Sequence, residues 1–411
     1  MPTHETRSAL EMSGFAMRSK GISKRIQSVS ISAIKEMMHL ALSYPDAISL
    51  AQGTPDFATP EHIRDRVKHE LDHNPNVGKY APLAGLPVLK EAIAEHLLSK
   101  RGIIANPQKE LYVTMGAMEA IASAIMTIAD SGDEVILLSP CFPSHITHTM
   151  LVEASPVYVR LDETRGWAFD INAFERAISP KTKAVVLCSP GNPTGTVLSE
   201  NDVRAIAVSA EEHDFWVITD EPYDFLVYDD ARFFSASQIP EIKNRLISCF
   251  SLSKEYAMTG WRIGYVYAEE GVINQMLKIH DAFAVSAATI SQYAALSALQ
   301  GDQLIVEFFR DEFLRRRDLM CARLDRLSEL FSYIKPGGAY YLFPKIIPET
   351  DEYAFAIRLL KEAGVVVVPG GAFGPGGEGH VRLCFAMSDD TINQAFDRIE
   401  KWNTSFSKTK L

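Results

Sequence analysis

Short apolar runs alternate with amphipathic stretches through the middle of the chain. Each run is bounded by polar turns, which is typical of strands buried inside a sheet. The runs occupy residues 111–114, 134–138, 184–188, 216–219 and 246–250. Helical periodicity fills the intervals, and Ser199 with Asp202 three residues later predicts the start of one helix. Strands that alternate with helices predict an α/β fold, in which a mostly parallel sheet carries helices on both faces.

The pattern changes after about residue 301. A long charged helix is followed by a glycine-containing turn, short strands and two further helices, and we interpret this part as a smaller α/β domain. Its elements are expected at 305–330, 335–343, 353–363, 365–368, 381–385 and after the capping residue Ser388. Before the first strand, helical patterns cover 56–72 and 86–101, whereas residues 1–20 show no clear periodicity.

Length and composition restrict the class of protein. A chain of 411 residues suggests two domains that share an interface. The net charge is 41 − 52 = −11, which argues against a nucleic-acid or anionic-membrane partner. The five scattered cysteines contain no Cys-x-x-Cys pair, a usage that suits a reducing compartment. Neither a secretory signal nor a membrane-spanning apolar stretch is visible, so we expect a soluble cytoplasmic protein.

Lys254 carries the clearest chemical signal. It follows the apolar run 245–250, and a lysine at the mouth of a strand can be desolvated, which lowers the pKa of its amine. A free amine can form a Schiff base with an aldehyde. Ser251, Ser253 and Arg262 lie close in sequence and could bind a phosphate. A Schiff-base lysine beside a phosphate site suggests pyridoxal phosphate, although a lone lysine after a strand is most often a surface residue.

Three other polar segments follow predicted strands. Asn192 belongs to Ser-Pro-Gly-Asn-Pro-Thr-Gly, Asp220 begins Asp-Glu-Pro-Tyr, and Gly116 opens an apolar helix. In open α/β sheets, ligands bind beyond the carboxyl ends of the strands. These segments and Lys254 can therefore converge on one crevice.

Together the segments resemble the class I/II aminotransferases, which are fold-type I pyridoxal phosphate enzymes. The resemblance rests on Ser-Pro-x-Asn-Pro-Thr-Gly, Asp-x-x-Tyr and Ser-x-Ser-Lys-x₇-Arg, and it extends roughly from residue 49 to 386. It implies a large domain with a mostly parallel, seven-stranded type of sheet and a smaller α/β domain. The implied division is an N-terminal segment 1–58 that packs with the small domain, a large cofactor-binding domain 59–304 and a small domain 305–411.

The resemblance also implies which residues hold the cofactor. Backbone N–H groups of a helix start, together with its dipole, favour a phosphate. The implied phosphate-binding residues are Gly116, Ala117, Met118, Ser251, Ser253 and Arg262. Alone, the Gly116 turn would signal only tight packing.

Four further residues would contact the cofactor ring. Asp220 would keep the pyridine nitrogen protonated, so that the ring can accept electrons. Tyr223 and Asn192 would bond its 3′-oxygen, and Phe142 would stack on the ring. Taken alone, Asn192 is a turn residue and Phe142 a core residue.

Substrate and partner contacts follow from the same resemblance. Arg382 matches the arginine that binds the substrate α-carboxylate, for which a bidentate fork is suited. Gly53 matches the glycine that lets the N-terminal segment approach the substrate. Tyr80 resembles the tyrosine that reaches the phosphate of the neighbouring subunit's cofactor, which implies a homodimer.

The expected reaction is transamination of an amino acid and a 2-oxo acid. Lys254 would carry the cofactor, be displaced by the substrate amine and then move the Cα proton, and 2-oxoglutarate is a common acceptor in the family. A β-lyase and an aminocyclopropane-carboxylate-synthase-like enzyme are alternatives, because they share the whole site. A regulator with a DNA-binding module is disfavoured by the short stretch before Gly53, and an inactive scaffold by the complete site.

Met118 bears on the amino donor. Some relatives that use aspartate carry a lysine at this position, which pairs with the distal carboxylate. Methionine cannot form such a pair, so neutral, apolar or aromatic donors are favoured. An aspartate aminotransferase remains an alternative, because other arginines could reach the pocket.

Two other patterns carry no function in this interpretation. Residues 374–379 match Gly-x-Gly-x-x-Gly, but a strand rather than a helix follows them, so the dinucleotide-binding prediction fails. His145 and His148 are spaced three apart without the ligands of a metal site, and we interpret both as ordinary polar residues.

Overall fold

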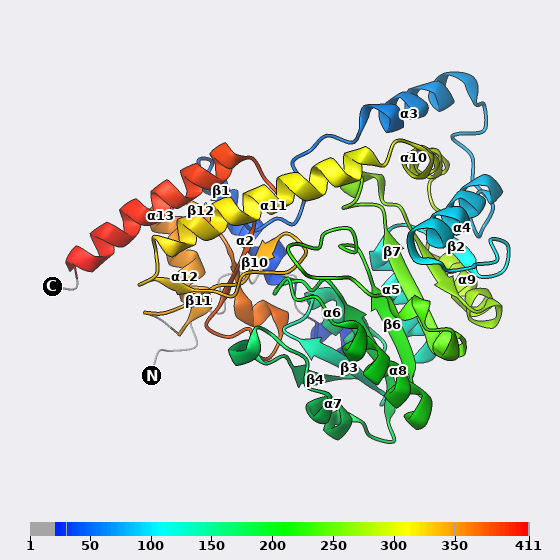
Figure 1. The fold of residues 1–411 in the computed structure, drawn as a ribbon, viewed down its shortest axis with the longest axis horizontal. Coiled ribbons are helices and arrows are strands. Elements are labelled where there is room, and N and C mark those ends of the chain that lie inside the picture. The colour runs from blue at the N-terminus through cyan, green and yellow to red at the C-terminus, as the bar shows by residue number, and fades with distance from the viewer. Residues whose placement is uncertain (1–20, 30, 349, 410–411) are drawn as a thin grey trace.

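A seven-stranded sheet organises the larger part of the molecule (Figure 1). The computed structural model describes residues 21–29, 31–348 and 350–409; the prediction for residues 1–20 lies outside them. In sheet order the strands are β2 (Leu111–Thr114), β8 (Gly264–Ala268), β7 (Leu246–Ser251), β6 (Trp216–Asp220), β5 (Thr182–Cys188), β3 (Glu134–Ser139) and β4 (Ser155–Arg160). The pairs from β4 through β7 are parallel, and only β8 runs antiparallel to its neighbours. The predicted α/β fold with a mostly parallel sheet is confirmed.

Helices cover both faces of this sheet, since alternate strand residues point to opposite sides. In β3, Val135 and Leu137 pack in one core, and Ile136 and Leu138 pack in another. The first core contains α5 (Ala117–Ile128), α6 (Pro143–Leu151) and α9 (Glu270–Ala284); the second contains α7 (Ile171–Ala177) and α8 (Glu200–His213). A third core lies beside β2 and β8 and contains α3 (Glu61–His73), α4 (Pro87–Arg101) and α10 (Thr289–Gln300).

Local signals position several helices where the sequence predicts them. The Ser199 side chain accepts a hydrogen bond from Asp202 N, and the Asp202 carboxylate accepts one from Ser199 N in return, so the predicted start of α8 is confirmed. The strands β4 and β8 were not predicted. β4 is an edge strand with only one fully buried residue, so its apolar pattern is weak.

A second body is built from both ends of the chain (Figure 1). From the N-terminal side it contains α2 (Ala33–Ala41) and β1 (Ile48–Ser49), and α1 (Lys24–Gln27) precedes them. From the C-terminal side it contains α11 (Leu304–Asp325), β9 (Phe331–Ser332), β10 (Tyr341–Leu342), β11 (Lys345–Ile346), α12 (Glu352–Arg358), β12 (Val365–Val366), β13 (Val368–Pro369), β14 (Val381–Cys384) and α13 (Asp389–Thr409). β1 pairs in parallel with β12, which joins the two ends.

The C-terminal elements differ from the predictions mainly at their boundaries. α11 ends at Asp325 rather than at 330, because the following apolar residues Leu327 and Leu330 turn into the core. The strand predicted at 365–368 is two short strands that pair with different partners. Ser388 Oγ accepts a hydrogen bond from Thr391 N, as expected for a cap of α13.

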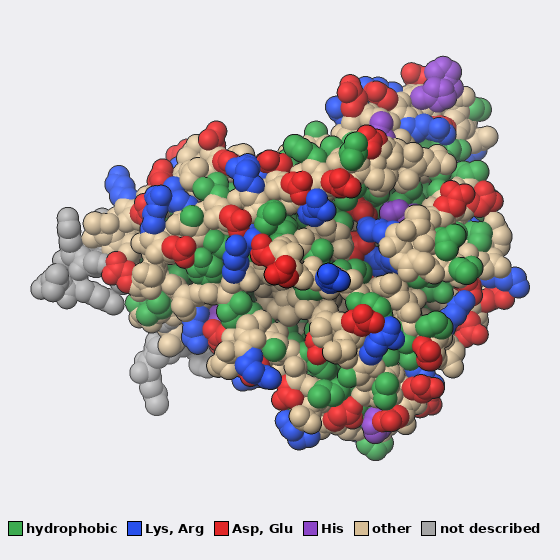
Figure 2. Space-filling view, viewed as in Figure 1, with side chains coloured by type: hydrophobic (Ala, Val, Ile, Leu, Met, Phe, Trp, Pro, Cys, Tyr) green, Lys and Arg blue, Asp and Glu red, His purple; other side chains and the backbone are tan. Residues whose placement is uncertain are grey.

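The visible surface mixes charges of both signs. Figure 2 shows acidic and basic side chains interspersed over this face, with no large area of one sign. Across the described ranges, no helix is both long and apolar enough to cross a bilayer. The same residues contain no group of three or more His, Cys, Asp or Glu side chains placed to hold a metal ion.

Candidate active site

A cavity of about 190 Å³ opens at the carboxyl ends of the central strands. Asp220 ends β6, Ser251 ends β7, and Asn192 follows β5. Parallel strands bring their carboxyl ends to one edge, so these side chains meet. The lining residues are Ile34, Gly53, Ala117, Met118, Ile121, Phe142, Cys188, Asn192, Asp220, Pro222, Tyr223, Ser251, Lys254, Arg262, Tyr341 and Arg382.

Lys254 extends from the turn after β7 into this cavity. Its Nζ donates a hydrogen bond of 2.7 Å to the carbonyl oxygen of Gly53, which also accepts one of 2.9 Å from Tyr340 Oη. Burial lowers the pKa of Lys254 to about 8, and the positive charges of Arg382 and Arg262 act in the same direction. The amine is therefore far more available as a nucleophile than that of an exposed lysine.

Asp220 is buried and holds only one partner. Its Oδ2 lies 2.9 Å from Nε2 of His145, which lies in the first turn of α6 and is also buried. Its Oδ1 is buried and has no hydrogen-bond partner within the part of the chain that the structure describes. A buried carboxylate oxygen with no partner is costly, so this atom is suited to a cationic N–H group. His145, interpreted from the sequence as an ordinary polar residue, thus makes a specific buried contact with this carboxylate.

Arg382 lies in β14 and is held from two sides. Its Nη1 donates to Asn192 Oδ1 at 2.9 Å, and Nη2 donates to the carbonyl oxygen of Ala51 at 2.6 Å. The guanidinium lies 4.3 Å from the ring centre of Tyr341. Only 1% of the residue is exposed, and its Nε has no hydrogen-bond partner among the described residues. The guanidinium is thus fixed at the cavity.

Tyrosine hydroxyls form the wall between the sheet and the C-terminal body. Tyr223 Oη and Tyr341 Oη lie 2.9 Å apart. Burial, with the neighbouring Tyr341, raises the pKa of Tyr223 well above its usual value, so this hydroxyl keeps its proton. Gly53 is required beside them, since a Cβ atom there would lie 2.0 Å from Tyr341 Oη.

The start of α5 forms a backbone cradle next to Arg262. Gly116 has φ +80° and precedes the first residue of the helix, Ala117. A Cβ on Gly116 would lie 2.9 Å from Arg262 Nη2, which itself donates to the carbonyl oxygen of Met115 at 3.2 Å. Free N–H groups at a helix start beside a guanidinium are suited to a phosphate.

Three of the site residues predicted from the sequence do not line the cavity. Gly116 lies at its rim, behind Ala117 and Arg262. Ser253 is buried, and its backbone N donates to Ser251 Oγ at 3.1 Å. Tyr80 is 80% exposed and lies on the surface of the single chain.

Five lining residues were missed by sequence reasoning: Ile34, Ile121, Cys188, Pro222 and Tyr341. Cys188 ends β5, so its position on a predicted strand could have indicated it. Ile34 comes from α2 and Tyr341 from β10, far from the strand ends in sequence. Their approach depends on packing between the two bodies, which periodicity does not reveal.

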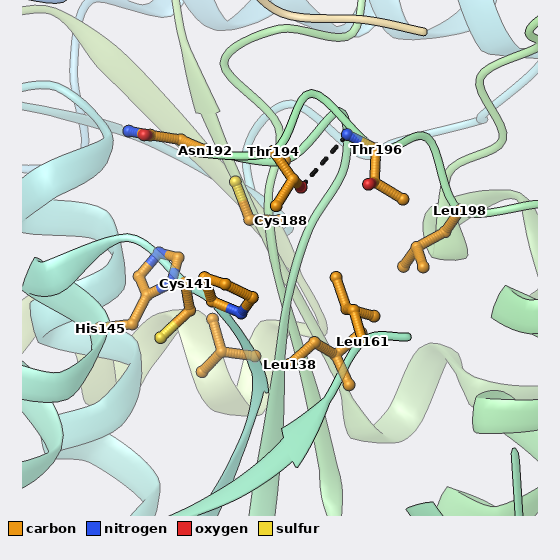
Figure 3. A pocket seen from close by; sticks show the side chains of 12 residues that line it. Leu138, Cys141, His145, Leu161, Cys188, Asn192, Thr194, Thr196 and Leu198 are labelled. Atoms are coloured by element: carbon orange, nitrogen blue, oxygen red, sulfur yellow. Dashed lines mark hydrogen bonds between the residues drawn. The ribbon is translucent and has the colours of Figure 1, made fainter. Parts of the chain in front are cut away.

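A small second cavity of about 20 Å³ lies behind the site (Figure 3). Asn192 and Cys188 line both cavities and thus form part of the wall between them. Figure 3 shows His145 and Cys141 on one side of this space and Leu161 and Leu198 on the other. Its lining is mostly apolar and includes His145, the hydrogen-bond partner of Asp220.

The donor set fits pyridoxal phosphate. Asp220 Oδ1 offers an unpartnered anion for a ring N–H, Lys254 offers a primary amine for the aldehyde, and the α5 start beside Arg262 offers a phosphate cradle. A sequence model of the family "Aminotransferase class I and II" matches residues 45–399. The chain belongs to this family. The aminotransferase is accordingly an enzyme that depends on pyridoxal phosphate, as the sequence predicts.

Known proteins resemble the aminotransferase over almost its full length. An aspartate aminotransferase of Pyrococcus abyssi is 38% identical and covers 92% of this chain and 97% of its own. Aromatic-amino-acid aminotransferase 2 of Thermococcus litoralis is 37% identical with the same coverage. The solved aspartate aminotransferase of Thermus thermophilus with maleate is 36% identical, covers 93% of this chain and 100% of its own, and superposes with a TM-score of 0.88.

Proposed function

We propose that this aminotransferase takes its amino group from neutral, apolar or aromatic L-α-amino acids and passes it to a 2-oxo acid such as 2-oxoglutarate. The observation that carries the proposal is the lining near the start of α5, where Met118, Ile121 and Ile34 face the cavity. The lysine and two arginines among the described lining residues are Lys254, Arg262 and Arg382, and each has a role in the proposed chemistry. None of the three is left to pair with a distal carboxylate.

The cofactor is held by the side chains that surround its expected groups. Arg262, Ser251, Ser253 and the backbone of residues 116–118 bind its phosphate, and the neighbouring subunit's copy of Tyr80 adds a further contact. Asp220 holds the ring nitrogen in its protonated form, and His145 keeps the carboxylate in place. The remaining ring contacts come from Phe142, Asn192 and Tyr223. When bound, the cofactor supplies an electron sink for the carbanion that forms at the substrate Cα.

The substrate is oriented by its α-carboxylate. Arg382 binds this group, and Asn192 and the Ala51 carbonyl hold the guanidinium so that its direction is fixed. A guanidinium held in one direction also fixes the orientation of the bound substrate. Such orientation supplies a large part of the rate enhancement of an enzyme. Gly53 leaves room for the substrate beside Tyr341.

Lys254 moves the proton. As a free amine, its Nζ would remove the proton from the substrate Cα. A pKa of about 8 suits this base, because a far larger fraction of the amine is unprotonated near neutral pH than in an exposed lysine. Lys254, Asp220 and Tyr223 are thus the proposed catalytic residues.

Aspartate is the second candidate donor, and the relatives favour it. Several are named aspartate aminotransferases, and one solved neighbour carries maleate, a dicarboxylate. The test is a donor screen with purified enzyme, with 2-oxoglutarate and pyruvate as acceptors. A kcat/KM for phenylalanine or leucine above that for aspartate supports the proposal, and a strong preference for aspartate contradicts it.

We further propose a cytoplasmic homodimer in which Tyr80 contributes to the partner's site. Exposure of 80% of Tyr80 in the single chain supports this role, as a contact residue must be free to reach across. We also propose the domain division 1–58, 59–304 and 305–411, which the β1–β12 pairing supports. An active monomer in sedimentation at micromolar concentration would exclude the dimer.

A further inference from the structure

Behind the cavity wall, five charged side chains form a buried network that we call the rear ion cluster. Arg101, the last residue of α4, contacts both Glu221 and Asp224. Lys100 Nζ lies 3.0 Å from Asp224 Oδ2 and 2.6 Å from Glu255 Oε1. The two cations therefore link three carboxylates that come from two different segments of the chain.

Each carboxylate of the rear ion cluster is the sequence neighbour of a residue that lines the cavity. Glu221 follows Asp220, and Asp224 follows Tyr223. Glu255 likewise follows Lys254. Within each pair, one side chain lines the cavity and the next joins the cluster, so the shared backbone is held from both sides.

Because the network is largely buried, the loss of any one charged member is costly. The exposed fractions of the side chains are 6% for Arg101, 3% for Glu221, 8% for Asp224 and 7% for Glu255. Burial alone would raise the pKa of Asp224, but Lys100 and Arg101 outweigh it and hold that pKa well below its usual value. Removing one member leaves a buried charge without its partner, whereas the intact network fixes one arrangement.

Other contacts lock the cluster in position. Ser235 Oγ donates to Glu221 Oε1 at 2.6 Å. The Arg101 guanidinium lies 4.7 Å from the ring centre of Phe250 in β7 and 5.2 Å from that of Phe233. A guanidinium held by two carboxylates and two rings has little freedom to shift. The end of α4 is thus tied rigidly to the segments that carry the site.

We propose that Arg101 and Lys100 are positioning residues, which set the relative placement of Asp220, Tyr223 and Lys254 by anchoring the residue that follows each of them. The proposal rests on the catalytic roles proposed above. The positioning effect applies to the side chains that face the cofactor. It does not extend to Arg382, because Asn192 and Ala51 hold that guanidinium independently.

The first test is Arg101→Gln in the holoenzyme. Misplacement of reacting groups by about 1 Å can cost about a hundredfold in rate, so we expect kcat to fall about tenfold to a hundredfold with a much smaller change in KM. Two readouts need no amino acid: the pH titration of the cofactor's visible absorbance and the rate at which pyridoxal phosphate dissociates. We expect a shifted titration and faster dissociation.

Arg323→Gln is the matched control. Arg323 is 7% exposed, close to the 6% of Arg101, and bridges Asp397 and Glu400, but it joins α11 to α13, away from the cavity. It should lower the thermal midpoint while leaving the absorbance titration and cofactor dissociation unchanged. A purely structural role for Arg101 predicts the same result for Arg101→Gln, and that outcome would overturn the proposal.

A charge-neutral variant separates positioning from electrostatics and covers the case in which Arg101→Gln does not fold. Lys100→Met with Glu255→Gln removes one cation and one anion, and Lys100 is 28% exposed, so the packing can adapt. Reduced kcat with a shifted titration supports the proposal, and parental values for both overturn it. Because the cofactor readouts contain no donor, they remain valid even if the proposed donor class is wrong.

Discussion

His145 Nε2 and Asp220 Oδ2 lie 2.9 Å apart, and both side chains are buried. The pair joins α6 to the end of β6 and leaves Asp220 Oδ1 as the carboxylate oxygen without a partner. One oxygen is therefore used to orient the group, and the other remains available to the cofactor.

Asp220→Asn should fold but slow turnover by orders of magnitude, because the ring nitrogen loses its charged partner. His145→Ala should have a smaller effect. Loss of a hydrogen bond to a charged group costs about 1.5–3 kcal/mol, or about tenfold to a hundredfold in kcat. Steady-state kinetics with circular dichroism as a folding check measures both. An unchanged kcat for Asp220→Asn would remove this residue from the mechanism.

Cofactor capture should depend on pH through Lys254. The pKa of its free amine is about 8, so the amine is protonated below that pH and nucleophilic above it. Stopped-flow binding of pyridoxal phosphate to cofactor-free enzyme should therefore accelerate as the pH rises from 7 to 9 and then level off. Lys254→Ala should bind without forming a covalent adduct that borohydride can trap. A rate independent of pH across this range contradicts the prediction.

Gly53→Ala should damage the site by steric contact. The added Cβ would lie 2.0 Å from Tyr341 Oη, so Tyr341 must move away from Tyr223 or the N-terminal segment must shift. We expect kcat/KM to fall by about tenfold or more, since overpacking of a well-packed site forces backbone and rotamer changes. Gly271→Ala in α9 is the control, because nothing lies within 4 Å of its Cβ position. Equal activity of both variants would show that the approach of Gly53 is unimportant.

Met118→Lys tests the donor proposal. The residue lines the cavity and is 39% exposed, so an added ammonium can reach the substrate side chain. One well-placed charged hydrogen bond is worth about 1.5–3 kcal/mol, so the kcat/KM for aspartate relative to leucine should rise about tenfold to a hundredfold. Met118→Gln adds polarity without charge and should change this ratio much less. A ratio that stays constant in Met118→Lys would place Met118 outside the side-chain pocket.

The sequence predicted the sheet and the strand-end side chains well, because both follow from local patterns. Asp220, Asn192 and Lys254 each come directly after an apolar strand, and parallel pairing alone brings them together. β4 was missed because an edge strand gives a weak pattern, whereas β8 is a fully buried run that the apolar pattern could have indicated.

The rest could not be predicted because it depends on contacts between distant segments. His145 appeared unremarkable until its ring was placed against Asp220, 75 residues later in the chain. Tyr341 and Ile34 reach the cavity only through packing of the two bodies. The rear ion cluster has no sequence signature, since charged residues at a helix end are usually solvated.

The pairing of β1 with β12 has a consequence for the order in which the molecule is made. Ile48 and Val365 are partners, so the strand just before Gly53 has no β12 to pair with until almost the whole chain has left the ribosome. The central sheet, which ends with β8 at Ala268, needs none of the later residues to pair its strands. The Lys254 amine and the Asp220 carboxylate can thus be assembled during synthesis. The contact that we propose between Arg382 and the substrate is completed last, when closure of this long loop brings β1 and β12 together.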